Sequence, residues 1–200
     1  MEWRDRYDKA NIDFTHPYYL QRNLSSAAIM DYRLKVTPDS ILIPTFDSSG
    51  LIGVTERMLD PEAKPKYLYH SDSTGKPPLW PYPWVDEEND YVFLTEGVFG
   101  AMRLRSLGYM AYSTMGVAAS TEQIHRIVTT NFRAETKLVV FYDDGLAGVI
   151  GAQKIANKMP CLVMFGEADE TNKTQAETLF SRALPSYEMD FDQRIEWHNG

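Results

Sequence analysis

The segment "LVVFYDDGLAG", residues 138–148, indicates the fold class of this 200-residue chain. Its first five residues are apolar, and the run stops on two adjacent carboxylates, Asp143 and Asp144, followed by a glycine. A short apolar run of this kind is typical of a strand buried on both faces, as in a parallel sheet. The two acids repel each other, so they indicate either an Asp-Gly turn or a charged site at the edge of the sheet.

From residue 89 onward the sequence alternates between strand and helix patterns. Strands are expected at "YVFLTE" (91–96), "YMAYST" (109–114), "KLVVFY" (137–142) and "CLVMF" (161–165). Helices are expected at 97–108, 120–132, 146–159 and 173–184, and Ser120 with Gln123 forms a capping box for the second of them. Alternation of this kind predicts an α/β domain with an open, parallel, four-stranded sheet flanked by helices.

The first 88 residues follow a different pattern, which predicts a small α+β subdomain. Two short helices are expected on either side of Asn23, followed by two strands joined by the turn at residues 47–50. The stretch from 60 to 90 is rich in proline, which excludes a continuous helix or a central strand. We therefore expect an N-terminal subdomain with a proline-rich linker at 1–88, an α/β domain at 89–185 and a tail at 186–200.

Composition limits the class of protein. The sequence has no apolar run long enough to cross a membrane and no secretory signal at its start, so we expect a cytoplasmic protein. With a single cysteine and four scattered histidines, a zinc site is not expected. The net charge is -8, which is unusual for a nucleic-acid binder, and residues 81–200 carry 17 acidic against 10 basic side chains. The acidic part of the chain favours divalent cations.

Two of the expected strands deliver acids to one edge of the sheet. Glu96 ends the strand at 91–96, and Asp143 follows the strand at 137–142. If these strands are neighbours, the two carboxylates converge, because functional groups of an open α/β sheet gather beyond the carboxyl ends of its strands. Converging carboxylates raise each other's pKa unless a cation separates them. The pattern predicts a site for Mg²⁺ or Mn²⁺, and ordinary turn chemistry is the alternative for Asp143 taken alone.

A family resemblance rests on several segments in one order. The segments "VFLTEGVFGAMRLRSLGYMAYSTMGVAASTEQIHRI" and "VVFYDDGLAGVIGAQKIA" resemble the TOPRIM domain of topoisomerases, primases and some nucleases. Upstream, "YLQRNLSSAAIMDYRL", "ILIPTFDSSGLIGVTERML" and "KPKYLYHS" are similar to the catalytic core of DnaG-type bacterial and phage DNA primases. The resemblance covers roughly residues 18 to 185 and implies a TOPRIM domain preceded by a primase-core subdomain.

The resemblance also implies roles for individual residues. Glu96 matches the glutamate of the TOPRIM motif, and Asp143 matches the first aspartate of its D-x-D pair. The sequence departs from the motifs at Gly100 and Gly145, where the family has aspartates, and Asp144 is the substitute for the second aspartate of the pair. The implied metal and catalytic residues are therefore Glu96, Asp143 and Asp144.

Further residues are implied around this acidic set. A further family acid follows the fourth strand, where the candidates are Glu167, Asp169 and Glu170. The upstream motifs imply a nucleotide- and template-binding set made of Arg57, Lys64, Lys66 and Tyr67.

Three functions follow, from different classes. The first is a phage-type primase that makes short RNA on single-stranded DNA from NTPs by metal-dependent nucleotidyl transfer during replication. The second is a replication or regulatory binding factor that has lost catalysis, for which Gly100 and Gly145 are the evidence. The third is a metal-dependent TOPRIM nuclease.

The expected partners follow from what such primases usually carry in addition. No zinc module or helicase-binding region is expected within these 200 residues. Template recognition and helicase coupling are therefore expected to come from a separate subunit and a replicative helicase. The tail "SYEMDFDQRIEWHNG", residues 186–200, is interpreted either as a docking segment for such a partner or as an element folded onto the core.

Overall fold

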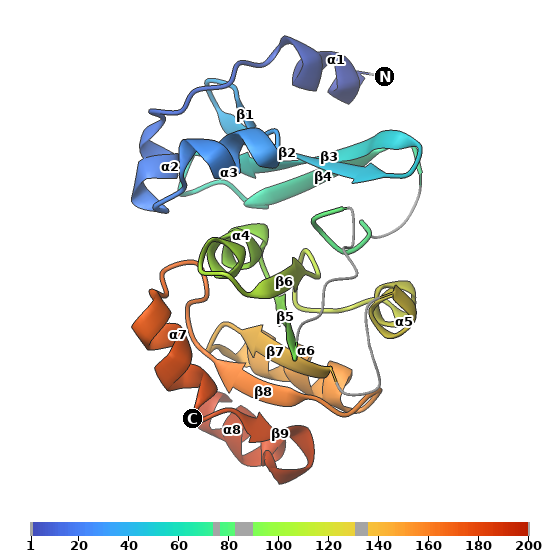
Figure 1. The fold of residues 1–200 in the computed structure, drawn as a ribbon. Coiled ribbons are helices and arrows are strands. Elements are labelled where there is room, and N and C mark those ends of the chain that lie inside the picture. Colours follow the sequence, from blue (N-terminus) through green and yellow to red (C-terminus); the bar gives the residue numbers. More distant parts are fainter. Residues whose placement is uncertain (1, 74–76, 83–89, 131–135, 200) are drawn as a thin grey trace. The chain divides into compact units, whose positions relative to one another are not determined.

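The chain folds into two compact units, seen in the computed structural model of Figure 1. The structure describes residues 2–73, 77–82, 90–130 and 136–199. The first unit comprises Met1–Pro77 with Pro81–Pro83, and the second comprises Pro78–Trp80 with Trp84–Gly200. The predicted boundary near residue 88 lies outside the described residues. Within the described part, no helix has the length and apolar character needed to cross a membrane.

The first unit is built on an antiparallel sheet. Its strands, in spatial order, are β1 (Lys35–Val36), β2 (Ser40–Asp47), β3 (Gly50–Met58) and β4 (Tyr67–Ser71). The predicted hairpin is confirmed, with Asp47 paired to Gly50 and the Asp47 carboxylate accepting a hydrogen bond from the Ser49 backbone N–H at 2.7 Å. Strands β1 and β4 were not expected, because β1 has only two residues and β4 begins directly after the prolines.

Three helices accompany this sheet: α1 (Glu2–Lys9), α2 (Pro17–Gln21) and α3 (Ser26–Asp31). The two short helices predicted around Asn23 are confirmed, and Asn23 joins them with a φ of 51°. The Ser25 side chain caps α3 by accepting from the Ala28 N–H at 3.1 Å. Helix α1 was missed because its sequence is almost entirely polar and Tyr7 is its one buried residue.

The second unit contains the predicted parallel sheet. Its strands run in the order β6 (Met110–Ser113), β5 (Tyr91–Thr95), β7 (Lys137–Tyr142), β8 (Leu162–Phe165) and β9 (Leu184–Pro185). The four predicted strands are all parallel, which confirms the α/β fold class. The short fifth strand β9 is antiparallel to β8 and was not expected. The helix predicted over 173–184 ends earlier, at Phe180, and the chain then turns back so that Leu184 pairs with Val163 of β8.

Helices cover both faces of this sheet. They are α4 (Val98–Ser106), α5 (Thr121–Thr130), α6 (Leu146–Ala156), α7 (Lys173–Phe180) and α8 (Phe191–Asn199). One face packs against α5, α6 and α8 through a core that includes Val140, Val149 and Phe191. On the other face Phe93 of β5 packs against Phe180 of α7, with ring centroids 5.7 Å apart. The predicted Ser120–Gln123 capping box is confirmed by reciprocal hydrogen bonds of 2.8 and 3.1 Å.

The C-terminal segment folds onto this core. After β9 it forms a 3₁₀ turn, η1 (Ser186–Glu188), and then α8. Phe191 is 8% exposed and joins the core cluster, with Met189 and Ile195 packed against it. Tyr187 and Trp197, by contrast, are 82% and 72% exposed. Of the two interpretations of the tail, the contacts of Phe191 favour an element that belongs to the core.

Phe191 should contribute strongly to stability. We expect Phe191→Ala to lower the free energy of unfolding by about 3 kcal/mol, because a buried ring is lost and a cavity is left. Trp197→Ala, on the same helix but exposed, should change it by no more than about 0.5 kcal/mol. Urea unfolding of both variants measures the two effects, and equal, small losses would show that α8 is not part of the core.

Candidate active site

Glu96 is the first residue after β5, and the neighbouring loop holds its backbone in place. The Glu96 carbonyl accepts hydrogen bonds from the Ser113 hydroxyl at 3.0 Å and from the Gly116 N–H at 2.9 Å. Both donors belong to the segment that ends β6. Helix α4 then begins at Val98, so the carboxylate stands at the carboxyl edge of the sheet between a strand and a helix.

Asp143 stands at the same edge, one strand away. Strands β5 and β7 are neighbours, and Thr95 pairs with Phe141, so Glu96 follows its strand in nearly the same register as Asp143. The predicted adjacency of the two strands is thereby confirmed. Helix α6 begins just after, and a Cβ on Gly148 would stand 2.2 Å from the Asp143 carbonyl oxygen. Only glycine at 148 allows the helix to start this close to the acidic residue.

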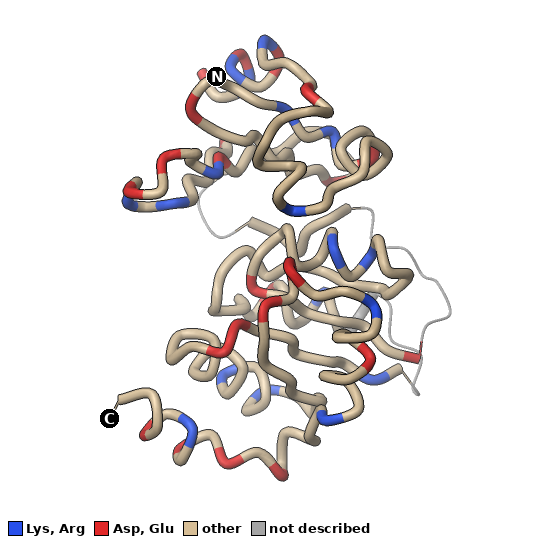
Figure 2. The backbone as a smooth tube through the Cα atoms, turned by 90° about the vertical axis from the view of Figure 1, so that its left-hand side faces the viewer, with Lys and Arg blue, Asp and Glu red and all other residues tan. Residues whose placement is uncertain are grey.

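The electrostatics of Glu96 show that these acids act on one another. Glu96 is half-buried, and its pKa rises from 4.5 to about 7, first because of desolvation and then because of the charges of Asp143 and Glu167. Glu167 follows β8, which is paired with β7. Three adjacent parallel strands therefore each place one acid at this edge. Figure 2 shows acidic positions gathered in the loops of the second unit.

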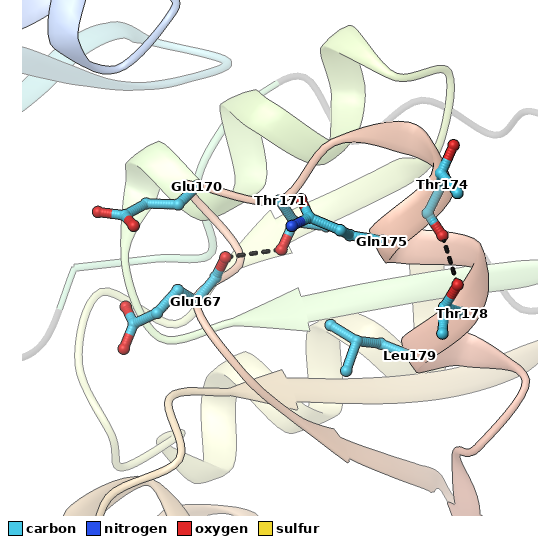
Figure 3. Close-up of a pocket in the computed structure, with 7 residues that line it drawn as sticks. All are labelled: Glu167, Glu170, Thr171, Thr174, Gln175, Thr178 and Leu179. Atoms are coloured by element: carbon cyan, nitrogen blue, oxygen red, sulfur yellow. Dashed lines mark hydrogen bonds between the residues drawn. The ribbon is translucent and has the colours of Figure 1, made fainter.

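Among the three acids that follow β8, Glu167 is the one whose charge raises the pKa of Glu96. Glu167 and Glu170 also line a pocket beside α7, together with Thr171, Thr174, Gln175, Thr178 and Leu179. Figure 3 shows the two glutamate side chains extending in the same direction, with the Thr171 hydroxyl donating to the Glu167 carbonyl at 2.7 Å. This hydrogen bond fixes the backbone at the pocket's acidic end.

The donor atoms at this edge fit a hard divalent cation. Carboxylate oxygens are the ligands that Mg²⁺ and Mn²⁺ prefer, and a cation would relieve the repulsion that raises the pKa of Glu96. Within the residues that the structure describes, no three His, Cys, Asp or Glu side chains converge tightly enough to hold a metal by themselves. Mg²⁺ is commonly held by one or two carboxylates with waters and substrate phosphates, so the Glu96–Asp143 pair meets that requirement.

Asp144 faces a different environment. Its Oδ1 lies 2.9 Å from an Arg194 Nη and 3.7 Å from the His198 Nε2, and both partners belong to α8. Arg194 and His198 were not picked out from the sequence, because no pattern links residue 144 to a helix fifty residues later. For its Oδ1 to bind a metal, as the sequence predicts for Asp144, that atom has to leave Arg194.

Gly100 is explained by packing. A Cβ at this position would meet the Ala168 Cβ at 3.0 Å and the Thr95 Cβ at 3.2 Å. Helix α4 thus lies close against the loop after β8, and a side chain at position 100 would require its neighbours to shift by a few tenths of an ångström. The glycine that stands at position 100, in place of the aspartate of the TOPRIM motif, therefore matches the close packing around it.

The predicted nucleotide- and template-binding residues lie in the first unit. Arg57 on β3 pairs with Tyr67 on β4, and its guanidinium lies over the rings of Tyr67 and Tyr18, at 5.2 and 5.6 Å. Burial of the Tyr67 hydroxyl raises the pKa of that residue to about 12. Lys64 and Lys66 are exposed in the turn that precedes β4. The sequence analysis missed Tyr18, which lies in α2 and reaches this cluster only in the folded unit.

Comparison with solved structures places this architecture among primase catalytic cores. The chain is similar to the DnaG catalytic core, with 17% identity and a TM-score of 0.71 over 96% of this chain and 82% of that one. It is also similar to the RNA polymerase domain of Mycobacterium tuberculosis primase DnaG in complex with double-stranded DNA, at 18% identity and a TM-score of 0.69 over 92% and 79% of the two chains.

A phage structure shows the same similarity. It contains the bacteriophage T7 lagging-strand DNA polymerase and the primase domains of two gp4 subunits bound to an RNA/DNA hybrid and dTTP. The match has 13% identity and a TM-score of 0.62, and it covers 83% of this chain and 91% of that chain. No protein-family model and no curated protein matches the sequence. At these identities the similarity establishes the fold.

The raised pKa of Glu96 predicts how stability changes with pH in the absence of metal. A carboxyl whose folded pKa lies above its unfolded value stabilises the fold below about pH 4.5 and loses that contribution as the pH rises through about 7. With a chelator present, Glu96→Gln should therefore be more stable than the wild type by roughly 1 kcal/mol at about pH 8.5, after allowance for solvent screening, and nearly equal at about pH 4.5.

Thermal unfolding at the two pH values measures this difference. Glu170→Gln, a substitution of an exposed acid in the next loop, is the matched control and should show no such pH-dependent gain. A Glu96→Gln protein that is less stable than the wild type at high pH would mean that Glu96 has a structural role.

Proposed function

We propose that this protein is a primase that makes short RNA primers on single-stranded DNA in a reaction that depends on Mg²⁺ or Mn²⁺. The observation that carries the proposal is the convergence of Glu96 and Asp143 at the edge of the parallel sheet, in a chain with the primase catalytic-core fold over 96% of its length. The sequence motifs that resemble the DnaG family fall on the same residues. Residues 89–185, which lie within the second unit, would then form a TOPRIM domain.

Glu96 and Asp143 are the proposed metal-binding residues, with Glu167 adding negative charge beside them. A bound cation would supply positive charge to the phosphates of the nucleotide and to the attacking hydroxyl. The protein's contribution is to hold the two carboxylates at fixed positions, through the Ser113 and Gly116 hydrogen bonds to Glu96 and the close start of α6 at Asp143. Asp144 is the third residue that the sequence predicts as a metal ligand.

The first unit would hold the nucleic acid and the incoming NTP. Lys64 and Lys66 are exposed cations that suit contacts with template phosphates. The Arg57 guanidinium lies over two tyrosine rings and donates a hydrogen bond to the Met58 carbonyl, so it is positioned before a ligand arrives. Its Nε is buried without a hydrogen-bond partner in the described residues. A preorganised guanidinium is suited to binding phosphate. Tyr67, whose ring contacts the Arg57 guanidinium, is proposed to orient that guanidinium toward the phosphate.

The partners of such an enzyme would be single-stranded DNA, NTPs and other replication proteins in the cytoplasm. The chain has a net charge of -8 and offers few Lys and Arg side chains to the phosphates of a template, so binding to isolated DNA should be weak. A replicative helicase or a separate template-recognition subunit would then raise the local concentration of template. The T7 assembly, whose primase domains are bound to an RNA/DNA hybrid, supports this arrangement by analogy.

A second candidate is a binding factor with this fold and no catalysis. The packing of Gly100 against Ala168 favours it, because an aspartate at that position would require its neighbours to shift. Both candidates use the same nucleic-acid surface. They differ in whether a product is formed.

The proposal is tested by incubating the purified protein with NTPs, single-stranded DNA and Mg²⁺ or Mn²⁺. We expect short RNA products, and we expect Glu96→Gln to reduce their yield roughly a hundredfold or more, as when one charge-positioning group is lost from an active site. Glu188→Gln, a substitution of an exposed acid in η1, is the control and should keep most of the yield. Cleavage of the template would indicate a nuclease, and DNA binding without product would indicate the binding factor.

A second test concerns the basic residues of the first unit. Each single-strand phosphate that a lysine neutralises adds about 0.7 to the slope of log affinity against log salt. Lys64→Ala with Lys66→Ala should therefore weaken DNA binding and lower the magnitude of that slope by about 1.4. Lys154→Ala with Lys158→Ala removes the same charge from the second unit and should leave the slope nearly unchanged. Fluorescence anisotropy at several salt concentrations measures it, and equal slopes for the two double variants would count against the assignment.

A further inference from the structure

The C-terminal helix reaches the edge of the sheet where the proposed cation site lies. Asp144 is adjacent to Asp143 in sequence, and its carboxylate is in contact with Arg194 of α8 at 2.9 Å. Without α8, the Asp144 carboxylate would lose its contacts with Arg194 and His198. The helix therefore determines the partner of one of the acids at this edge.

Several contacts fix Arg194 in this position. Its guanidinium lies over the Phe165 ring, 4.4 Å from the ring centroid, so it packs against the last residue of β8. Phe191, one turn earlier, anchors α8 in the core. The Gln153 amide of α6 donates to the Asp192 carboxylate of α8 at 3.4 Å. The Phe165 ring thus packs against the Arg194 side chain, and the other two contacts hold the helix that carries it.

The pairing with Asp144 is the one polar contact that the structure gives the Arg194 guanidinium among the described residues. The Arg194 Nε is buried without a hydrogen-bond partner there, and so is the His198 Nε2, which stands 3.7 Å from the same carboxylate oxygen. Side chains of Arg194 and Asp144 are 34% and 43% exposed. An ion pair this exposed is weak enough for a divalent cation to displace it.

We infer that Arg194 is a positioning residue that holds the Asp144 carboxylate on α8 and withholds it from the cation bound by Glu96 and Asp143. The inference rests on the proposed function of that site. Two carboxylates bind the cation while the ion pair is intact, and a third becomes available when Arg194 releases Asp144. The affinity for the cation is thereby limited by a residue of the C-terminal helix.

The test is a Mn²⁺ titration by calorimetry on the full chain. Arg194→Met removes the charge while keeping an apolar stem over Phe165, and it should tighten Mn²⁺ binding about three- to fivefold, the scale of an exposed ion pair. In an Asp144→Asn background the same substitution should give no gain, because there is no carboxylate to release. Arg182→Met, an exposed arginine after α7, is the control for the loss of one charge and should leave the affinity unchanged.

The outcomes are distinct. An equal gain in both backgrounds would mean that Arg194 acts only through its electric field, and this would overturn the inference. No gain in either background, while Glu96→Gln still weakens Mn²⁺ binding, would overturn the inference and leave the proposed site standing. If Glu96→Gln binds Mn²⁺ as the wild type does, the proposed site itself is wrong. Thermal unfolding of each variant confirms that α8 remains folded during the comparison.

Discussion

The arrangement of the second unit depends on repulsion between carboxylates that the parallel sheet brings to one edge. Parallel strands end together, so acids that follow β5, β7 and β8 are held near one another by the same hydrogen bonds that form the sheet. Burial of Glu96 strengthens the effect, because less water is present to screen the charges. The fold thus maintains an unfavourable charge distribution that a cation would make favourable.

Close backbone packing keeps this arrangement rigid. Gly148 lets α6 begin against the carbonyl of Asp143, and Gly100 lets α4 approach the loop that carries Glu167. A larger residue at either position would push a helix away from the edge and separate the acids. The two glycines therefore control the spacing of charged side chains that they do not contact.

Much of this was predictable from local sequence. Apolar runs predict the four parallel strands, and cap residues predict the Ser120–Gln123 capping box. The rule that parallel strands end at one edge predicts that Glu96 and Asp143 lie near each other. The environment of Asp144 was not predictable, because Arg194 reaches it only after α8 packs on α6. Strand β4 and helix α1 were missed for a related reason: their residues are polar or half-exposed, and tertiary contacts form the element where the periodicity is weak.

The two edges of the parallel sheet have a consequence for how the protein behaves at high concentration. At one edge, Trp80 makes two hydrogen bonds with Ser113, of 2.7 and 3.1 Å, and so covers β6. At the other, β9 has only two residues, and Pro185 has no N–H to offer to a further strand. Exposed strand edges are where sheets of separate molecules join, and here neither edge presents a long unpaired backbone. Among the described residues, the sheet therefore offers little free strand backbone to which the sheet of another molecule could add.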